Sequence, residues 1–104
     1  MSYTVIITPS AKADIFEINT WLLENYPSYA DAWLWGISQS ITSLSRFPER
    51  CMVASESDAL EVAAHQLLYG KKPNVYRILF MIEENRVLIL HVRHTRQQQL
   101  SEEI

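Results

Sequence analysis

Residues 75–96 of this chain read VYRILFMIEENRVLILHVRHTR. Two runs of β-branched, aromatic and aliphatic residues flank the polar sequence Glu-Glu-Asn-Arg at 83–86. Strand-forming residues on both sides of turn-tolerant ones predict a β-hairpin. The second run ends in a group of cationic or titratable side chains: His91, Arg93, His94 and Arg96. The sequence therefore predicts a buried hairpin with positive charge at one end.

The turn of this hairpin determines which side chains share a face of the sheet. A two-residue turn at 84–85 makes His94 the diagonal neighbour of Arg77, with Cα atoms roughly 7–8 Å apart. We favour this register because the asparagine in the turn tolerates the positive φ that tight hairpins require. A three-residue turn would invert the parity and group Arg77 with His91 and Arg93 instead. Both registers place a cationic cluster near one end of the hairpin.

Length and composition indicate one ordered globular domain spanning residues 1–104. A chain of this length can build one hydrophobic core but not two, and 48% hydrophobic residues argue against disorder. The sequence has no long uncharged apolar run, and its start lacks a secretory signal pattern. Cys51 is the only cysteine, which excludes an internal disulfide, and we expect a reducing, cytoplasmic environment. The polar tail at 97–104 is expected to be frayed.

Charge is unevenly distributed along the chain, whose net charge is −3. Residues 1–69 carry three Lys or Arg against eight Asp or Glu, whereas residues 70–99 carry six against two. The second segment predicts a local surface for an anionic ligand, to which Lys71 and Lys72 contribute. Ordinary solvated charge is the alternative for these two lysines. A protein that coats nucleic acid broadly would be basic overall, and this chain is not.

Hydrophobic periodicity and breaker residues predict the order of the elements. We expect a strand at 3–7, helices at about 9–25 and 28–47, a connecting loop at 49–59 and a strand at 61–69, all before the hairpin. Because the helices are so close in sequence, they should form an antiparallel helical hairpin. The predicted fold class is α+β with two layers: an N-terminal strand, then a helical hairpin packed on a largely antiparallel four-stranded sheet (β-α-α-β-β-β).

Capping residues predict where the two helices begin and end. Thr8 is the expected N-cap of the first helix, with Pro9 at the first helical position, where its missing N–H costs nothing. Pro27 disfavours helical geometry in the residue before it and so ends this helix. Ser28 is expected to cap the second helix, and Pro48 to close it.

Side chains at helical spacing predict which helix faces are buried. The expected stripe of the second helix is Ala30, Trp33, Ile37, Ile41 and Leu44, broadened by Leu34 and Phe47. On the first helix, Asp14 is expected to face outward. Trp21 and Trp35, like Trp33, are interpreted as core or edge packing rather than as a stacking site.

The hairpin is apolar on both faces, which is unusual for a sheet covered on one side. One face is predicted to carry Leu79, Met81, Leu88 and Leu90, and the other Ile78, Phe80, Ile82 and Ile89. Two helices can cover only one of these faces. The remaining face must meet the long loop, a second copy of the chain or a partner protein.

Few residue patterns point to catalytic chemistry. His91 and His94 fall on opposite faces of a strand, His65 is distant, and no second cysteine exists, so we expect no metal site. No nucleophile elbow is present, and two glycines cannot build a phosphate-cradling loop, so we expect no cofactor.

The cluster at the hairpin end is the remaining candidate: Arg77, Arg93, His94 and Arg96. Arginine offers a fixed fork of donors to phosphate, and histidine exchanges protons near neutral pH. Such a group could bind and cleave RNA by activating a 2′-hydroxyl and stabilising the developing charge. The structural alternative is that Arg77 pairs with an acidic residue and His94 caps the strand end.

Five segments together resemble the RelE/ParE toxin superfamily of type II toxin–antitoxin modules, which includes plasmid stabilisation proteins. They are LLYG at 67–70, YRILF at 76–80, VLILHVRHTR at 87–96, TPSA at 8–11 and FPER at 47–50. The resemblance covers essentially the whole chain. It implies a compact toxin neutralised by an antitoxin whose C-terminal segment wraps around it.

The resemblance also implies one of two activities: ParE-like inhibition of DNA gyrase, or RelE-like cleavage of ribosome-bound mRNA. In the second case Arg77, His94 and Arg96 match catalytic positions. However, Thr95 stands where some nucleases have a tyrosine, and His65 stands where the family often has an arginine. We favour the gyrase activity on the charge, the long helices and the missing aromatic. A non-toxic interaction module with the same fold is the third reading.

The resemblance assigns binding surfaces to the remaining candidates. Anion or target binding is expected from Arg93, Lys71, Lys72 and His65. The antitoxin is expected to dock on the outer hairpin face: Leu79, Met81, Leu88 and Leu90. The expected partners are thus a cognate antitoxin, in a hetero-oligomer, and either gyrase or the ribosome with its mRNA.

Overall fold

The structure, a computed structural model, describes residues 2–95, so Arg96 and the predicted tail at 97–104 lie outside the described residues. The elements are β1 (Thr4–Ile7), α1 (Pro9–Asn25), α2 (Pro27–Ser43), the 3₁₀ helix η1 (Pro48–Arg50), α3 (Ser57–Leu60), β2 (Ala64–Lys71), β3 (Asn74–Glu83) and β4 (Arg86–His94). The strands form one sheet in the order β1-β4-β3-β2. Strand β1 runs parallel to β4, and the other pairs are antiparallel. The predicted α+β class and element order are confirmed.

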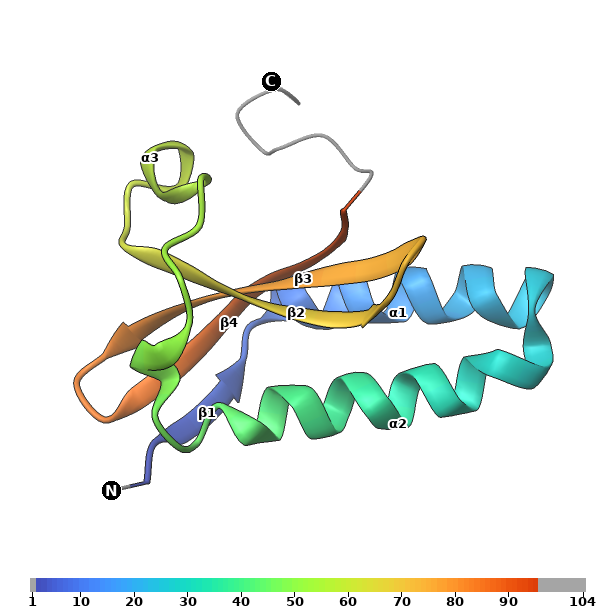
Figure 1. Cartoon of the computed structure of the whole chain (residues 1–104), viewed down its shortest axis with the longest axis horizontal. Helices are drawn as coiled ribbons and strands as arrows, with labels where there is room; N and C mark the ends of the chain where they lie inside the picture. The colour runs from blue at the N-terminus through green and yellow to red at the C-terminus, as the bar shows by residue number, and fades with distance from the viewer. Residues whose placement is uncertain (1, 96–104) are drawn as a thin grey trace.

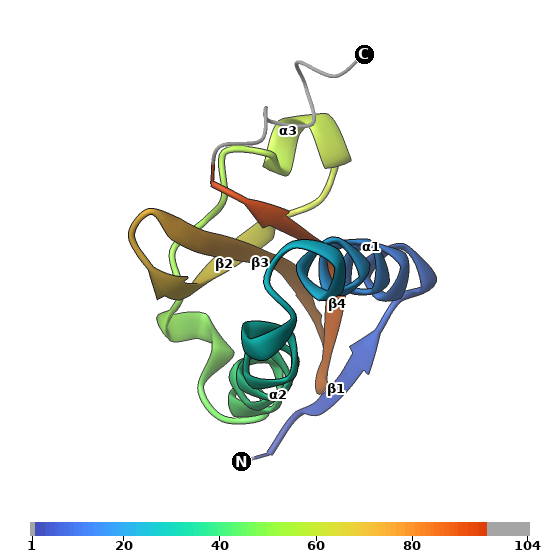
Figure 2. The same cartoon turned by 90° about the vertical axis from the view of Figure 1, so that its right-hand side faces the viewer.

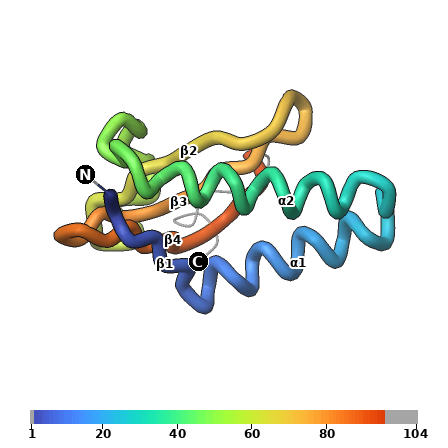
Figure 3. Tube along the Cα trace, turned by 90° about the horizontal axis from the view of Figure 1, so that it is seen from below, coloured from blue at the N-terminus to red at the C-terminus, as the bar shows by residue number. Residues whose placement is uncertain are grey.

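Two layers are visible in the arrangement of the elements. Helices α1 and α2 lie antiparallel and cover one face of the sheet, whereas α3 lies over the opposite face (Figures 1 and 2). Seen from below, the helical hairpin extends beyond the sheet on the side of the β2–β3 turn (Figure 3). We call the face covered by α1 and α2 the helix face and the other the outer face. No helix in residues 2–95 combines the length and apolar character needed to cross a membrane.

The main core lies between α2 and the helix face. Trp33 and Ile37 of α2 and Ile78, Phe80 and Ile89 of the hairpin are all fully buried there. Burial of side chains of this size stabilises the fold by about 1.5–3 kcal/mol each. The predicted stripe of α2 is confirmed from Ala30 to Leu44.

The edges of that stripe differ from the prediction. Leu34 is 37% exposed and Phe47 is 72% exposed, so neither broadens the core. Trp21 and Trp35 are also exposed, and only Trp33 of the three tryptophans is a core residue. Phe47 is excluded because α2 ends at Ser43, and the chain then turns through a left-handed conformation at Phe47 (φ 48°).

The helix starts follow the capping prediction at α1 but not at α2. The Thr8 hydroxyl accepts a hydrogen bond from the Ala11 amide at 3.3 Å, and Pro9 occupies the first helical position. Tyr26 alone separates the two helices and forms the N-cap of α2. The expected Ser28 cap is therefore wrong, because Pro27, with its fixed φ, is itself the first residue of the helix.

The tight turn of the hairpin is confirmed, since Glu83 lies opposite Arg86 and Ile82 opposite Val87. The residue that adopts a positive φ is Glu84 (φ 57°), the first turn residue, and not the expected asparagine that follows it. Among two-residue hairpin turns, the type with a positive φ at the first central residue alone is type II′.

A β-bulge between Leu79 and Phe80 changes the register beyond the turn. It inserts one extra residue in β4, so that Arg77 lies opposite Arg93 and Tyr76 lies opposite His94. Directly opposed residues share a face, and neighbours along a strand alternate. Arg77 and His94 are therefore on opposite faces, and the predicted diagonal pair is wrong.

The segment predicted as a plain loop at 49–59 overlaps η1 at its start and α3 at its end. Its end and α3 cover part of the outer face, where Leu79 is fully buried with Ala54 and Ala64 beneath Leu60 and Val62. The long loop, one of the three partners expected for this face, thus covers its end near Leu79. Met81, Leu88 and Leu90 remain partly exposed on the same face.

Candidate functional site

Arg77 lies on β3 and is held by two side chains on the outer face. One guanidinium Nη forms an ion pair with Glu56, and its Nε donates to Oε1 of Gln66 at 3.1 Å. The side chains of Arg77 and Glu56 are 12% and 1% exposed. Arg77 thus pairs with an acidic residue, which is the structural alternative given for it above.

The charge of Glu56 is stabilised despite its burial. Desolvation by burial raises the pKa of this carboxyl, but Arg77, the residue's own backbone N–H and Ser55 together outweigh it, so the pKa is lowered. The adjacent Ser57 ties the segment down, because its hydroxyl donates to the Ala54 carbonyl at 2.8 Å and accepts from the Ala64 amide at 3.1 Å. Arg77 therefore anchors the α3 segment to the sheet.

Asp14 does not face outward as expected, but contacts the edge of β4. Its Oδ2 lies 3.0 Å from Nδ1 of His91 and accepts from the Val92 amide at 3.0 Å. Strand β1 ends at Ile7, so β4 has no neighbouring strand here and its amide needs another acceptor. Asp14 supplies that acceptor and orients His91.

His94 is separated from Arg77 by the sheet. Its ring packs edge-on against Tyr76, with centroids 5.0 Å apart and planes at 86°. Tyr76 belongs to the main core, which places His94 on the helix face. The bulge instead groups Arg77, Arg93 and His91 on the outer face. This is the grouping expected from a three-residue turn, although the turn itself has two residues.

The other cationic candidates are spread over the sheet. Lys71 and Lys72 are exposed at the β2–β3 turn. His65 lies near the other end of β2, stacks on Phe80 at 5.5 Å and bonds the Cys51 carbonyl at 3.0 Å through Nδ1. His65 therefore packs as a structural residue and does not join the lysines.

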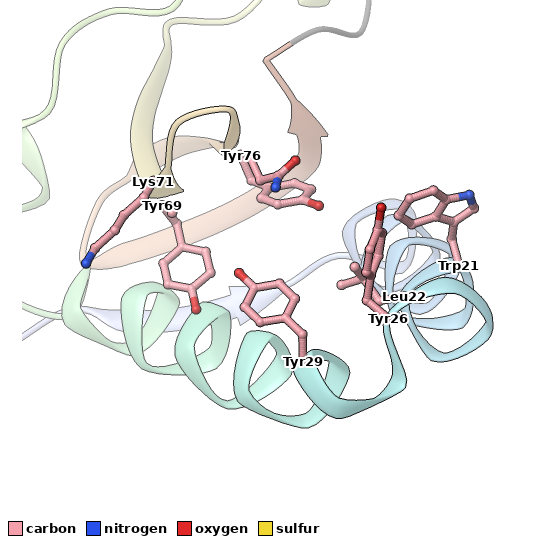
Figure 4. A pocket seen from close by; sticks show the side chains of 9 residues that line it. Trp21, Leu22, Tyr26, Tyr29, Tyr69, Lys71 and Tyr76 are labelled. Atoms are coloured by element: carbon pink, nitrogen blue, oxygen red, sulfur yellow. The ribbon is translucent and has the colours of Figure 1, made fainter.

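Sequence reasoning missed a cavity of about 810 Å³ beside the end of the helical hairpin. It is lined by Trp21, Leu22, Tyr26, Tyr29, Tyr69, Gly70, Lys71, Asn74 and Tyr76 (Figure 4). These residues come from α1, α2 and the β2–β3 hairpin, and no periodicity relates them. The available signal was the tyrosine content of this short chain, since four of its five tyrosines line the cavity.

A comparison with protein families matches residues 5–99 to the family described as the ParE toxin of the type II toxin–antitoxin system parDE. Among curated proteins, no sequence matches this chain.

Several solved structures have a similar fold, and two of them are toxin–antitoxin systems. A chain of the chromosomal ParDE toxin–antitoxin system from P. aeruginosa superposes with a TM-score of 0.72 at 16% identity, covering 89% of this chain and 96% of that one. A chain of the RelBE2 toxin–antitoxin complex from Mycobacterium tuberculosis gives a TM-score of 0.54 at 24% identity, covering 90% and 99%. With the family match over nearly all of its length, this chain belongs to the ParE toxin family of type II toxin–antitoxin systems.

Proposed function

We propose that this toxin inhibits DNA gyrase and does not itself cleave RNA. The observation that carries the proposal is the separation of Arg77 and His94 onto opposite faces of the sheet. Cleavage needs a proton-transfer group and a charge-stabilising donor directed at the same phosphate. Here the Arg77 charge is already neutralised by buried Glu56, and His94 packs on Tyr76. A protein that acts by binding needs neither group at a common phosphate.

Cleavage of ribosome-bound mRNA is the second candidate, and one observation favours it. Arg93 and His91 share the outer face with Arg77, and Asp14 orients the His91 ring. An oriented imidazole beside arginines is a plausible acid–base group. The two candidates differ in what purified toxin does to gyrase and to RNA.

We expect purified toxin to block supercoiling of relaxed plasmid by DNA gyrase and to leave mRNA on translating ribosomes intact. Added antitoxin should restore supercoiling. His94→Gln and His91→Gln should retain growth inhibition, because neither is an acid–base catalyst in this mechanism. If instead either variant loses mRNA cleavage by about 10²–10⁴-fold, the expected loss for such a group, the second candidate is correct. Unchanged gyrase activity at saturating wild-type toxin would remove the first.

The antitoxin, we further propose, docks on the exposed part of the outer face. Met81 and Leu90 line a cavity of about 250 Å³ beside Leu60 and Val62, and Leu88 lies on the same face. Leu79 is fully buried beneath α3, so it supports this surface from below and does not contribute a contact. Partly exposed aliphatic side chains beside a hollow suit the apolar side of a bound segment.

Leu88→Asp is expected to weaken antitoxin binding about 100-fold, because a carboxylate would be buried without a partner in the complex. The antitoxin encoded beside the toxin would be titrated calorimetrically into each toxin variant. Leu23→Asp is the matched control, since Leu23 is an exposed leucine on α1. Equal affinities for the two variants, both shown to be folded by circular dichroism, would place the antitoxin elsewhere.

A further inference from the structure

The cavity of about 810 Å³ lies between the α1–α2 connection and the β2–β3 turn. Figure 4 shows the rings of Tyr29, Tyr69 and Tyr76 on one side of it and those of Trp21 and Tyr26 on the other. Its volume lies within the range of small-molecule sites. Neither the proposed gyrase inhibition nor the antitoxin surface uses these residues.

The wall formed by the sheet is preorganised. The Tyr76 ring makes edge-to-face contacts with two other rings. The centroid distances are 5.2 Å to Trp33 and 5.0 Å to His94. Tyr69 lies directly on α2 at Gly36, where an added Cβ would come within 1.8 Å of the tyrosine oxygen. Glycine at this position is therefore what allows the Tyr69 ring to form part of the wall.

The opposite wall consists of two aromatic rings that are open to solvent. Trp21 is 54% exposed and Tyr26 is 58% exposed. Tyr29, on the same side as Tyr69 and Tyr76, is 41% exposed. The centroids of the Trp21 and Tyr26 rings are 5.8 Å apart, and the ring planes are inclined at 52°. The two rings are therefore not stacked face to face. A contiguous exposed apolar surface often marks a binding site, whereas single exposed apolar side chains are ordinary.

The cavity is lined by polar groups that can donate hydrogen bonds and by one cation. Of the nine described residues that line it none is acidic, Lys71 is cationic, and Asn74 offers both a donor and an acceptor. Burial, and secondarily the nearby Tyr29, raises the pKa values of Tyr69 and Tyr76, so both phenols keep their O–H at neutral pH. Lys71 lies at the edge of the cavity, with its ammonium beyond the Tyr69 ring (Figure 4), and Lys72, the next residue of the chain, is exposed. On a chain with a net charge of −3, a cavity lined by Lys71 and by no acidic residue favours an anionic ligand over a cationic one.

A second cavity of about 500 Å³ adjoins the first and shares Trp21, Asn74 and Tyr76 with it. Its lining contains charges of both signs, from Asp14, Glu17 and Arg93, together with His94. The acidic side chains thus stand on the α1 side, away from the lysines of the β2–β3 turn. An extended ligand would place its negative group at the lysine side.

We propose that the larger cavity binds a nucleotide, with the base among the aromatic rings and the phosphate at Lys71 and Lys72. Aromatic faces stack bases of any identity, and an asparagine side chain can bond a base edge. The Tyr69 hydroxyl already donates to the Trp33 carbonyl at 3.5 Å. An apolar peptide side chain would fill the space but would offer no hydrogen bond to the Tyr29 or Tyr76 hydroxyl or to Asn74. The nucleotide can be free or an unstacked residue of a single strand.

The test is calorimetric titration with 5′-AMP and fluorescence anisotropy with a labelled single-stranded oligoadenylate, both on full-length toxin. Trp21→Leu should weaken binding about tenfold through lost stacking. Tyr29→Phe removes only a hydroxyl and should weaken it less. Lys71→Gln should weaken binding and reduce its salt dependence. Trp35→Leu, an exposed tryptophan that does not line the cavity, is the matched control and should bind like the wild type.

The two ligands separate the two sources. AMP binding as tight as that of the oligonucleotide supports a free nucleotide, and binding of the oligonucleotide alone supports a strand. No binding of either ligand at millimolar concentration overturns the proposal, as does equal weakening by Trp21→Leu and Trp35→Leu. Binding of N-acetyltryptophanamide in place of AMP would also overturn it, since the cavity would then accept a protein side chain.

Discussion

Arg77→Ala is expected to lower the free energy of unfolding by about 3–5 kcal/mol, since removing one partner of a buried ion pair leaves the other charge uncompensated. Glu56, 1% exposed, would lose its guanidinium, and Gln66 would lose the Nε donor. The α3 segment, anchored through Glu56, should detach first. Urea denaturation followed by circular dichroism measures the loss at neutral pH.

The pH dependence of stability should also reverse in this variant. In the wild type the Glu56 pKa is lowered from 4.5, so its contribution is complete above about pH 4.5 and is lost as the pH falls through the folded-state pKa. Without Arg77, burial dominates and raises the pKa of Glu56. The charged carboxyl then destabilises the fold at neutral pH, and acidification through the raised pKa relieves the penalty.

Two further variants isolate the buried pair. Arg86→Ala breaks the Glu83–Arg86 pair, whose side chains are 46% and 44% exposed, and should cost at most about 1 kcal/mol. Glu56→Gln combined with Arg77→Ala should recover part of the loss, because no buried charge remains. If Arg77→Ala and Arg86→Ala were equally mild, Arg77 would not anchor the α3 segment.

Trp33→Ala should destabilise the fold by about 3–5 kcal/mol, a large part of the stability of a domain of this size. Trp33 is fully buried at the centre of the helix-face core and contacts the Tyr76 ring at 5.2 Å. Alanine would leave a cavity that α2, packed along its whole stripe, cannot close. Thermal unfolding followed by circular dichroism provides the measurement.

Trp33→Phe separates the loss of ring volume from the loss of the indole N–H. The indole Nε1 is buried without a hydrogen-bond partner among residues 2–95. Phenylalanine keeps an aromatic ring and removes that unpaired donor, so we expect a loss of only about 1 kcal/mol. The exposed Trp35→Ala should change stability by less than about 0.5 kcal/mol. A similar loss for Trp33→Ala and Trp35→Ala would contradict the assigned core.

Local sequence patterns determined most of the fold. Thr8 with Pro9 started α1, the spacing from Ala30 to Leu44 defined the buried face of α2, and strand formers around residues 83–86 defined the hairpin. Each of these signals depends on residues close together in the chain. The family resemblance added the toxin class, which the match over residues 5–99 established.

The tertiary structure decided how the candidate site is arranged. One extra residue at the bulge moved His94 to the face opposite Arg77, and alternation along a strand amplifies such a shift over every later position. The partner of Arg77 comes from Glu56, across a segment without clear periodicity. The aromatic cavity gathers side chains from α1, α2 and the β2–β3 hairpin. Contacts between distant segments depend on how packed elements meet, and that information is not present in any local stretch of sequence.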